Sequence, residues 1–278
     1  MNAMDIRAGE DPDMQSRERV LTSLDHQEPD RVPIDLSGHP SSGIAAMAYP
    51  RLRDALDLPP KPVRVYDMVQ QLAIVHEDVL DRLGVDVIEL GRGFCRDDDY
   101  WEDWTLPDGT PCQVPAWSVP EREEERWVLR SDSGRVIAAM PDDSVYFEQT
   151  YWPFMDEDGP DTVEGAMDEC MWTVLEHPPG PWVDDEELAE GARRLRERSD
   201  RAITGIFGGN LLEMGQFLYR NDRFFTLLAG EPDRAEKCLD DLVDFYMPAL
   251  ENYLEQVGEY IDIIQFGDDL GMQNGPLI

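Results

Sequence analysis

The stretch DRAITGIFGGN (residues 200–210) decides the fold class, because an apolar run leads directly into a glycine-rich polar loop. The same order recurs in RVPIDLSG (31–38), in VDVIELG (85–91) and in YIDIIQFGDDLGMQNG (260–275). A run that is apolar throughout, rather than alternating, is typical of a strand buried on both faces of a parallel sheet. We therefore predict four parallel strands, each followed by a polar loop.

Helical patterns separate these strands, as parallel pairing requires. The helix that begins at Ser16 is expected to keep Arg17 and Arg19 on its outer face. Residues 65–84 show the clearest helical spacing in the first half of the chain, with apolar side chains at Met68, Leu72, Val75, Val79 and Leu83. Further helices are predicted over residues 44–56, 184–199, 211–230 and 232–258, the last with a kink near Pro248.

This order of elements is typical of an α/β fold, and we expect a (β/α)8 TIM barrel. Only four strong strands are readable, so we expect the barrel to be C-terminally truncated at Ile278. An open sheet of four or five strands is the alternative. Residues 1–15 are expected to form a disordered tail, and residues 16–278 a partial barrel domain.

Residues 95–150 follow a different pattern. Two segments in this range alternate apolar and polar side chains around Asp-Gly and Asp-Ser-Gly turns, which predicts a β-hairpin insertion after the second strand. The insertion is either a lid over a pocket or a surface cap with its own small core.

The charge of the chain is extreme, since 60 Asp and Glu residues against 24 Lys and Arg residues give a net charge of −36. Nucleic acids and anionic membranes both need a basic surface, so neither is an expected partner. The sequence contains neither an apolar run long enough to span a bilayer nor a secretory signal, and we expect a cytoplasmic protein.

Lysine is scarce and aspartate abundant, a composition that resembles the proteins of extreme halophiles; an ordinary acidic cytosolic protein is the alternative. Salt screens repulsion between like charges, so the halophilic interpretation predicts a melting temperature that rises from low salt to molar KCl. A flat or falling melting temperature would remove that interpretation.

The four cysteines lie far apart and without histidine at metal-ligand spacing, which favours buried free thiols over a structural zinc site. They are Cys95, Cys112, Cys170 and Cys238.

The loops that follow the four strands are predicted to form one active face, because functional groups of such folds lie just beyond the carboxyl ends of strands. These loops are GHPSSG (38–43), GRGFCRDDD (91–99), FGGN (207–210) and GDDLGMQNG (267–275). Asp268 and Asp269 follow a strand directly, and adjacent carboxylates raise one another's pKa, so they are the candidates for a catalytic acid or base. The alternative is that such an aspartate caps a helix or accepts backbone N–H groups.

Six further residues are candidates for substrate binding. His39 follows the first strand, although a histidine in such a place more often anchors its loop. Glu213 and Gln216 lie three residues apart on one helix, and Gln273 lies in the last loop. Gly208 and Gly209 permit close approach of backbone to a ligand. We assign no metal ligand.

Several segments together resemble the uroporphyrinogen decarboxylase family. They are SRERVLTSLDHQEPDRVPIDLSGHPSSGIAAMAYPRL, RVYDMVQQLAIVHEDVLDRLGVDVIEL, DGTPCQVPAW, RSDSGRVIAAMP and DIIQFGDDLGMQNGPLI. More narrowly, they resemble its methyltransferase-like branch, related to cobalamin-dependent methyltransferases. The resemblance implies a (β/α)8 barrel and movement of a methyl group between a small donor and a corrinoid protein or a thiol.

Two departures from the family pattern matter. The decarboxylase holds its acidic porphyrinogen with an arginine-rich loop, whereas GHPSSG has no arginine. The methyltransferase members bind zinc through a His-x-Cys pair and a later Cys, at positions beyond Ile278, so zinc and corrinoid are expected only with a longer chain. Decarboxylation of uroporphyrinogen, a tetrapyrrole, and a non-catalytic binding protein or inactive fragment are the two alternatives.

Overall fold

A computed structural model of the chain describes residues 14–93, 100–175 and 185–277. Its centre is a parallel sheet in which β10 (Ala202–Gly208) lies between β3 (Val87–Glu89) and β11 (Ile263–Phe266). Asp35 adds a parallel bridge to Val87, so four parallel segments lie side by side in chain order. The protein is therefore an α/β protein with parallel strands, and its described residues do not form a closed barrel.

The first predicted strand is reduced to this single bridge residue. Pro33 has no N–H group to donate, and the N–H of Ile34 donates to the Asp86 carboxylate at 2.8 Å instead of to a strand. Within residues 31–38 only Asp35 keeps strand pairing.

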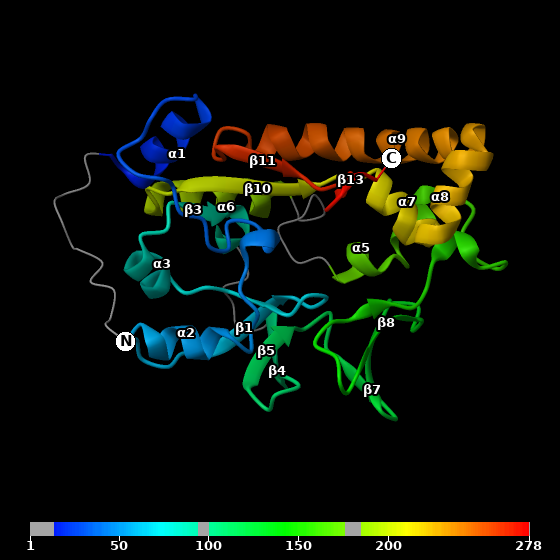
Figure 1. The fold of residues 1–278 in the computed structure, drawn as a ribbon, viewed down its shortest axis with the longest axis horizontal. Helices are drawn as coiled ribbons and strands as arrows, with labels where there is room; N and C mark the ends of the chain where they lie inside the picture. The colour runs from blue at the N-terminus through cyan, green and yellow to red at the C-terminus, as the bar shows by residue number, and fades with distance from the viewer. Residues whose placement is uncertain (1–13, 94–99, 176–184, 278) are drawn as a thin grey trace.

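Helices surround the sheet as the periodicity predicted. Figure 1 shows α9 (Pro232–Val257) running alongside β10 and β11, with α1 (Ser16–Leu24) beside the amino ends of the strands and α7 (Leu212–Tyr219) beside their carboxyl ends. The helix α6 (Asp185–Arg198) also contacts α9, and α8 (Asn221–Gly230) joins α7 to α9. The helix α9 continues through Pro248, which is exposed. The remaining helices are short: α2 (Tyr49–Ala55), α3 (Glu77–Leu83), α4 (Val163–Met167) and α5 (Met171–Leu175).

The helix predicted over residues 65–84 is wrong for most of its length. The chain forms β1 (Val63–Asp67) and β2 (Leu72–Ala73), and only α3 is helical. The strand β1 pairs in parallel with β5 (Pro111–Pro115), which lies in the insertion. Burial of the β-branched Val63 and Val65 against this distant partner outweighs the helical spacing, because β propensity depends on such packing.

The insertion contributes strands to two sheets. One is a mixed sheet with the order β2-β1-β5-β4, in which β5 pairs in parallel with β1 and antiparallel with β4 (Trp101–Thr105). The other has the order β6-β7-β8-β9 and contains β6 (Glu121–Glu123), β7 (Arg126–Arg130), β8 (Val136–Pro141) and β9 (Glu148–Gln149). Trp104 and Trp127 meet edge to face between the sheets, with ring centroids 5.5 Å apart.

Two buried carboxylates anchor the amino ends of the parallel strands. Asp86 precedes β3, and Arg19 and Arg31 donate to it at 2.7 and 2.6 Å. Arg19 is only 1% exposed, so the prediction that it lies on the outer face of α1 is wrong. Burial opposes ionisation of Asp86, but hydrogen bonds from Arg31 and the backbone lower its pKa below the usual value.

Asp262 occupies the corresponding place before β11. Arg17 and Arg196 each donate to its carboxylate at 2.7 Å, and the N–H of Ile203 donates at 2.9 Å. The carboxylate is almost fully buried. Each of the two carboxylates is therefore paired with two arginines and a backbone N–H donor. Such contacts offset the free-energy cost of removing a charge from water.

Within the described segments, no helix combines the length and apolar character that crossing a bilayer would need.

Candidate functional site

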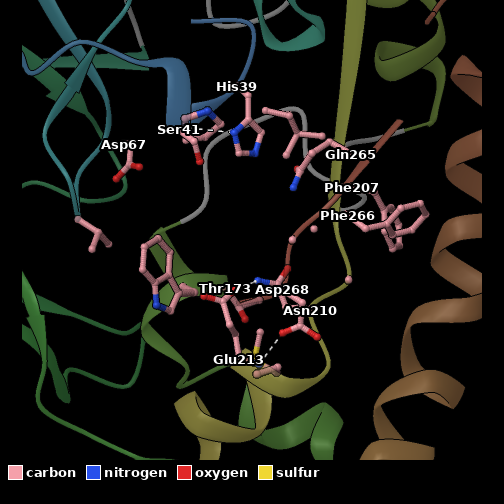
Figure 2. A pocket seen from close by; sticks show the side chains of 18 of the residues that line it. His39, Ser41, Asp67, Thr173, Phe207, Asn210, Glu213, Gln265, Phe266 and Asp268 are labelled. Atoms are coloured by element: carbon pink, nitrogen blue, oxygen red, sulfur yellow. Dashed lines mark hydrogen bonds between the residues drawn. The ribbon is translucent and has the colours of Figure 1, made fainter. Parts of the chain in front are cut away.

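A cavity of about 640 Å³ lies at the carboxyl ends of the parallel strands. Its walls come from the loop around His39, the turn after β1, the ends of β3, β10 and β11, and the helices α5 and α7. Figure 2 shows side chains from these separate segments around one hollow. Three of the four predicted loops therefore contribute to a single cavity. Most of the fourth loop, including Arg96 and Asp97 to Asp99, lies outside the described residues.

Six of the eight candidate residues line this cavity: His39, Gly208, Gly209, Glu213, Asp268 and Asp269. Gln216 does not line it, because its side chain is buried along α7 and donates to the Leu212 carbonyl at 3.3 Å. Gln273 does not line it either, since it lies exposed in the turn between β12 (Gly271–Met272) and β13 (Gly275–Pro276).

Asp268 caps the helix α7 from the neighbouring loop. The backbone N–H groups of Leu212 and Glu213 donate to its carboxylate at 2.9 and 2.7 Å, and that of Leu211 at 3.3 Å. The residue before the helix, Leu211, provides no side-chain cap of its own. These contacts correspond to the capping alternative for Asp268, because they satisfy N–H groups that the first turn of a helix leaves without a partner.

Glu213 is the carboxyl group of this cluster best suited to hold a proton. Burial raises its pKa above the usual value, and the charges of Asp268 and Asp269 add to the rise. A hydrogen bond from the Asn210 amide acts in the opposite direction. Among the carboxyl groups of Glu213, Asp268 and Asp269, Glu213 is therefore the one whose surroundings favour the protonated form.

The two glycines serve the turn between β10 and α7. Gly208 and Gly209 have φ values of 79° and 62°, in the region that side chains disfavour. A Cβ atom on Gly209 would also lie 3.0 Å from the Phe207 ring. These glycines let the chain reverse directly from the strand into the helix that carries Glu213.

His39 is held in a defined orientation by its own loop. Its Nδ1 accepts the N–H of Ser41 at 3.0 Å, and its backbone N–H donates to the Ser42 hydroxyl at 3.2 Å. In the neutral ring the other nitrogen, Nε2, is then the N–H donor. Figure 2 places the ring beside the cavity, so His39 both anchors its loop and presents this donor.

Sequence reasoning missed several lining residues. Glu89 ends β3 and is 7% exposed, and Gln265 is the polar residue within the apolar β11. A polar side chain inside an apolar strand was the signal that could have found both. Trp172 and Phe217 also line the cavity, but they lie in segments whose pattern did not point to a site.

The cavity wall carries much more negative than positive charge. Five carboxyl groups line it: Asp67, Glu89, Glu213, Asp268 and Asp269. Neither arginine nor lysine lines it among the residues that the structure describes. Such a surface repels anionic ligands and attracts cationic ones.

The described residues do not fit zinc. They include no group of three or more His, Cys, Asp and Glu side chains arranged to hold a metal ion. Burial raises the pKa of Cys112 to about 12 and that of Cys238 to about 11, whereas zinc binds the thiolate form. Cys170 is also a buried free thiol, and Cys95 lies outside the described residues.

Comparison with known proteins yields little. No protein-family model matches the chain, and no curated protein matches it. A solved structure described as a methyltransferase from Methanosarcina mazei matches this chain with a TM-score of 0.43 and 14% sequence identity. The match covers 95% of this chain and 62% of that one, so this chain spans less than two thirds of the length of that structure.

Proposed function

We propose that this chain forms the substrate-binding part of a methyl-transfer enzyme that acts on a small donor. The methyl group would pass from that donor to a thiol or to a corrinoid protein at the open end of the cavity. Methyl transfer comes from the family resemblance of the sequence, and the site supports it over decarboxylation of uroporphyrinogen. The observation that carries this choice is the carboxylate-rich wall of the cavity.

Uroporphyrinogen carries eight carboxylates and needs cationic side chains to hold them. The described lining residues include neither arginine nor lysine. The carboxylates of Glu213, Asp268 and Asp269 would repel such a substrate. A small donor without negative charge meets no such repulsion.

The cavity also offers what methyl transfer needs from a protein. Transfer to a nucleophile requires that the donor be held in one orientation, with water kept from the reacting atoms. Met214, Phe217 and Trp172 provide an apolar wall, and Glu213 and Gln265 provide polar groups that can orient the donor. We place Glu213 against the donor, because it is half-buried on the helix that forms this wall.

The test is a direct comparison of the two reactions. The protein is incubated with ¹³C-methyl-labelled small donors and a thiol, with and without a corrinoid, and methyl thioether is followed by NMR. In parallel, uroporphyrinogen is supplied and coproporphyrinogen is measured by chromatography. We expect thioether formation that is lost in Glu213→Gln. Formation of coproporphyrinogen would overturn the proposal, and binding of a donor without turnover would favour the non-catalytic alternative.

A further inference from the structure

One wall of the cavity combines a carboxylate with aromatic rings. Glu213 and Phe217 both line the cavity and lie four residues apart on α7, so they share one face of the helix. The ring of Phe217 contacts that of Trp172 on α5, with centroids 5.4 Å apart and planes tilted by 38°. Met214 lines the cavity between them in sequence. Two helices thus build a continuous surface of carboxylate, thioether and aromatic faces.

Negative charge is concentrated beside this surface. Asp268 accepts the N–H groups at the start of α7, and Asp269 follows it in the same loop. The N-terminus of α7 offsets part of the charge of Asp268. Neither Glu213 nor Asp269 takes part in an ion pair within the described residues. A bound cation would therefore relieve the repulsion among these carboxylates.

The geometry points to a small methylated ammonium ion as the ligand of this cavity. The inference rests on the proposed function, and it specifies the chemical class of the methyl donor. A methylated ammonium has a diffuse charge and few or no N–H groups, so aromatic faces and nearby carboxylates bind it without a matching set of hydrogen-bond acceptors. A metal ion would need several ligands at one point, and the described residues hold no such group.

The reaction with such a donor is balanced. The thiolate sulfur attacks a methyl carbon of the ammonium, and the S–C bond forms with the electron pair of the thiolate. The C–N bond breaks, and its electron pair stays on nitrogen. A cation and an anion thus become a neutral amine and a neutral thioether, and no external oxidant or reductant is required.

The experiment compares choline with 3,3-dimethylbutan-1-ol, its uncharged analogue of the same shape. Binding to the protein is measured by calorimetry and by ligand NMR at constant ionic strength in KCl. We expect choline to bind at least about tenfold more tightly, a difference of about 1.4 kcal/mol. Equal binding of the two compounds, or no binding of either, would overturn the inference.

Variants distinguish the contribution of the cavity wall to choline binding from that of the overall charge of the protein. Glu213→Gln and Trp172→Leu should each weaken choline binding several-fold, while Glu251→Gln should leave it unchanged. Glu251 lies exposed on α9, away from the cavity, and its substitution changes the net charge by the same amount as that of Glu213. Unfolding curves and circular dichroism show whether each variant is folded. Equal weakening in Glu251→Gln would show that choline responds only to net charge.

The outcomes also separate this inference from the proposed function. If the uncharged analogue binds as well as choline, and methyl transfer from an uncharged donor is observed, the inference fails and the proposed function stands. If choline binds selectively but no donor transfers its methyl group, the inference stands and the proposed function fails.

Discussion

Carboxylate side chains have opposite surroundings at the two ends of the parallel strands. At the amino ends, Asp86 and Asp262 are buried, and each is paired with two arginines. At the carboxyl ends, Glu213, Asp268 and Asp269 surround a cavity, and none of the three takes part in an ion pair within the described residues. The first set holds the strands and helices together, whereas the second leaves negative charge available to a ligand.

This difference shows why the net charge of −36 says little about the site. Arginine is not scarce in the molecule, and four arginines neutralise the two structural carboxylates: Arg17, Arg19, Arg31 and Arg196. The absence of arginine and lysine from the described cavity lining is therefore a local property. It is the pairing of each carboxylate, rather than the number of carboxylates, that distinguishes the two ends.

The largest effect is expected for Asp86→Asn. The substitution keeps the shape of the side chain but takes the buried carboxylate away from Arg19 and Arg31, while Arg19 keeps its ion pair with Asp30. Removing one partner of a buried ion pair costs about 3–5 kcal/mol of unfolding free energy, and because Asp30 still neutralises Arg19 we expect the lower end of that range, about 3 kcal/mol. Urea denaturation measures the change. A loss smaller than about 1 kcal/mol would contradict the comparison. The paired carboxylates at the amino ends would then contribute no more to stability than the unpaired carboxylates around the cavity.

Lowering the pH should reduce stability through the same network of arginines and carboxylates around Asp86. Hydrogen bonding and charge from Arg19 lower the pKa of Asp30 to about 2, and the pKa of Asp86 is also lowered. A carboxyl whose pKa is lower in the folded protein contributes stability above its unfolded pKa of about 3.9, and this stability is lost as the pH falls through the folded pKa. We expect the unfolding free energy to drop between pH 5 and pH 2.5.

The pH dependence also has its own control. In Asp86→Asn the drop should be shallower, because one of the contributing carboxyls is absent. Glu213 acts with the opposite sign, since its raised pKa means that protonation favours the folded state. A steeper drop in Asp86→Asn would contradict the assignment of the acid response to the amino-end network.

A smaller effect is expected for Asp268→Asn, with Asp269→Asn as its matched neighbour. Asp268 accepts three N–H groups at the start of α7, so loss of its charge should cost about 1 kcal/mol. Asp269 has no such contact among the described residues, and its substitution should change stability by less than about 0.5 kcal/mol. Equal costs at the two positions would mean that the cap does not contribute to stability.

The smallest effect on stability is expected for Glu213→Gln. The amide keeps a hydrogen-bond partner for Asn210 and removes a charge from a repulsive cluster, so the unfolding free energy should stay within about 0.5 kcal/mol or rise slightly. The same variant should bind choline several-fold more weakly. A large loss of stability would place Glu213 with the structural carboxylates instead.

The elements that were predicted well depend on local pattern. Residues 184–199 and 232–258 show long helical periodicity, and the structure has α6 and α9 there. The apolar runs around β10 and β11 were recognised for the same reason. Residues 65–84 were not, because the partner that makes Val63 and Val65 a strand lies in β5, about fifty residues later.

The site was predictable in location but not in roles. Loops after parallel strands meet at one edge of the sheet, and this rule brought His39, Glu213 and Asp268 to the same cavity. The capping role of Asp268 depends on the register between two neighbouring loops, and the burial of Arg19 depends on contact with Asp86, 67 residues away. Neither relation leaves a mark in the local sequence.

The capping of α7 by Asp268 limits how the cavity can be redesigned. The loop after β11 supports the start of α7, and α7 carries Glu213 and Phe217. Exchanging residues 267–269 alone would remove the acceptor on which that helix begins. A design that alters ligand specificity should therefore exchange the loops after β10 and β11 together, as one unit. The start of α7, and with it the cavity wall, then keeps its support.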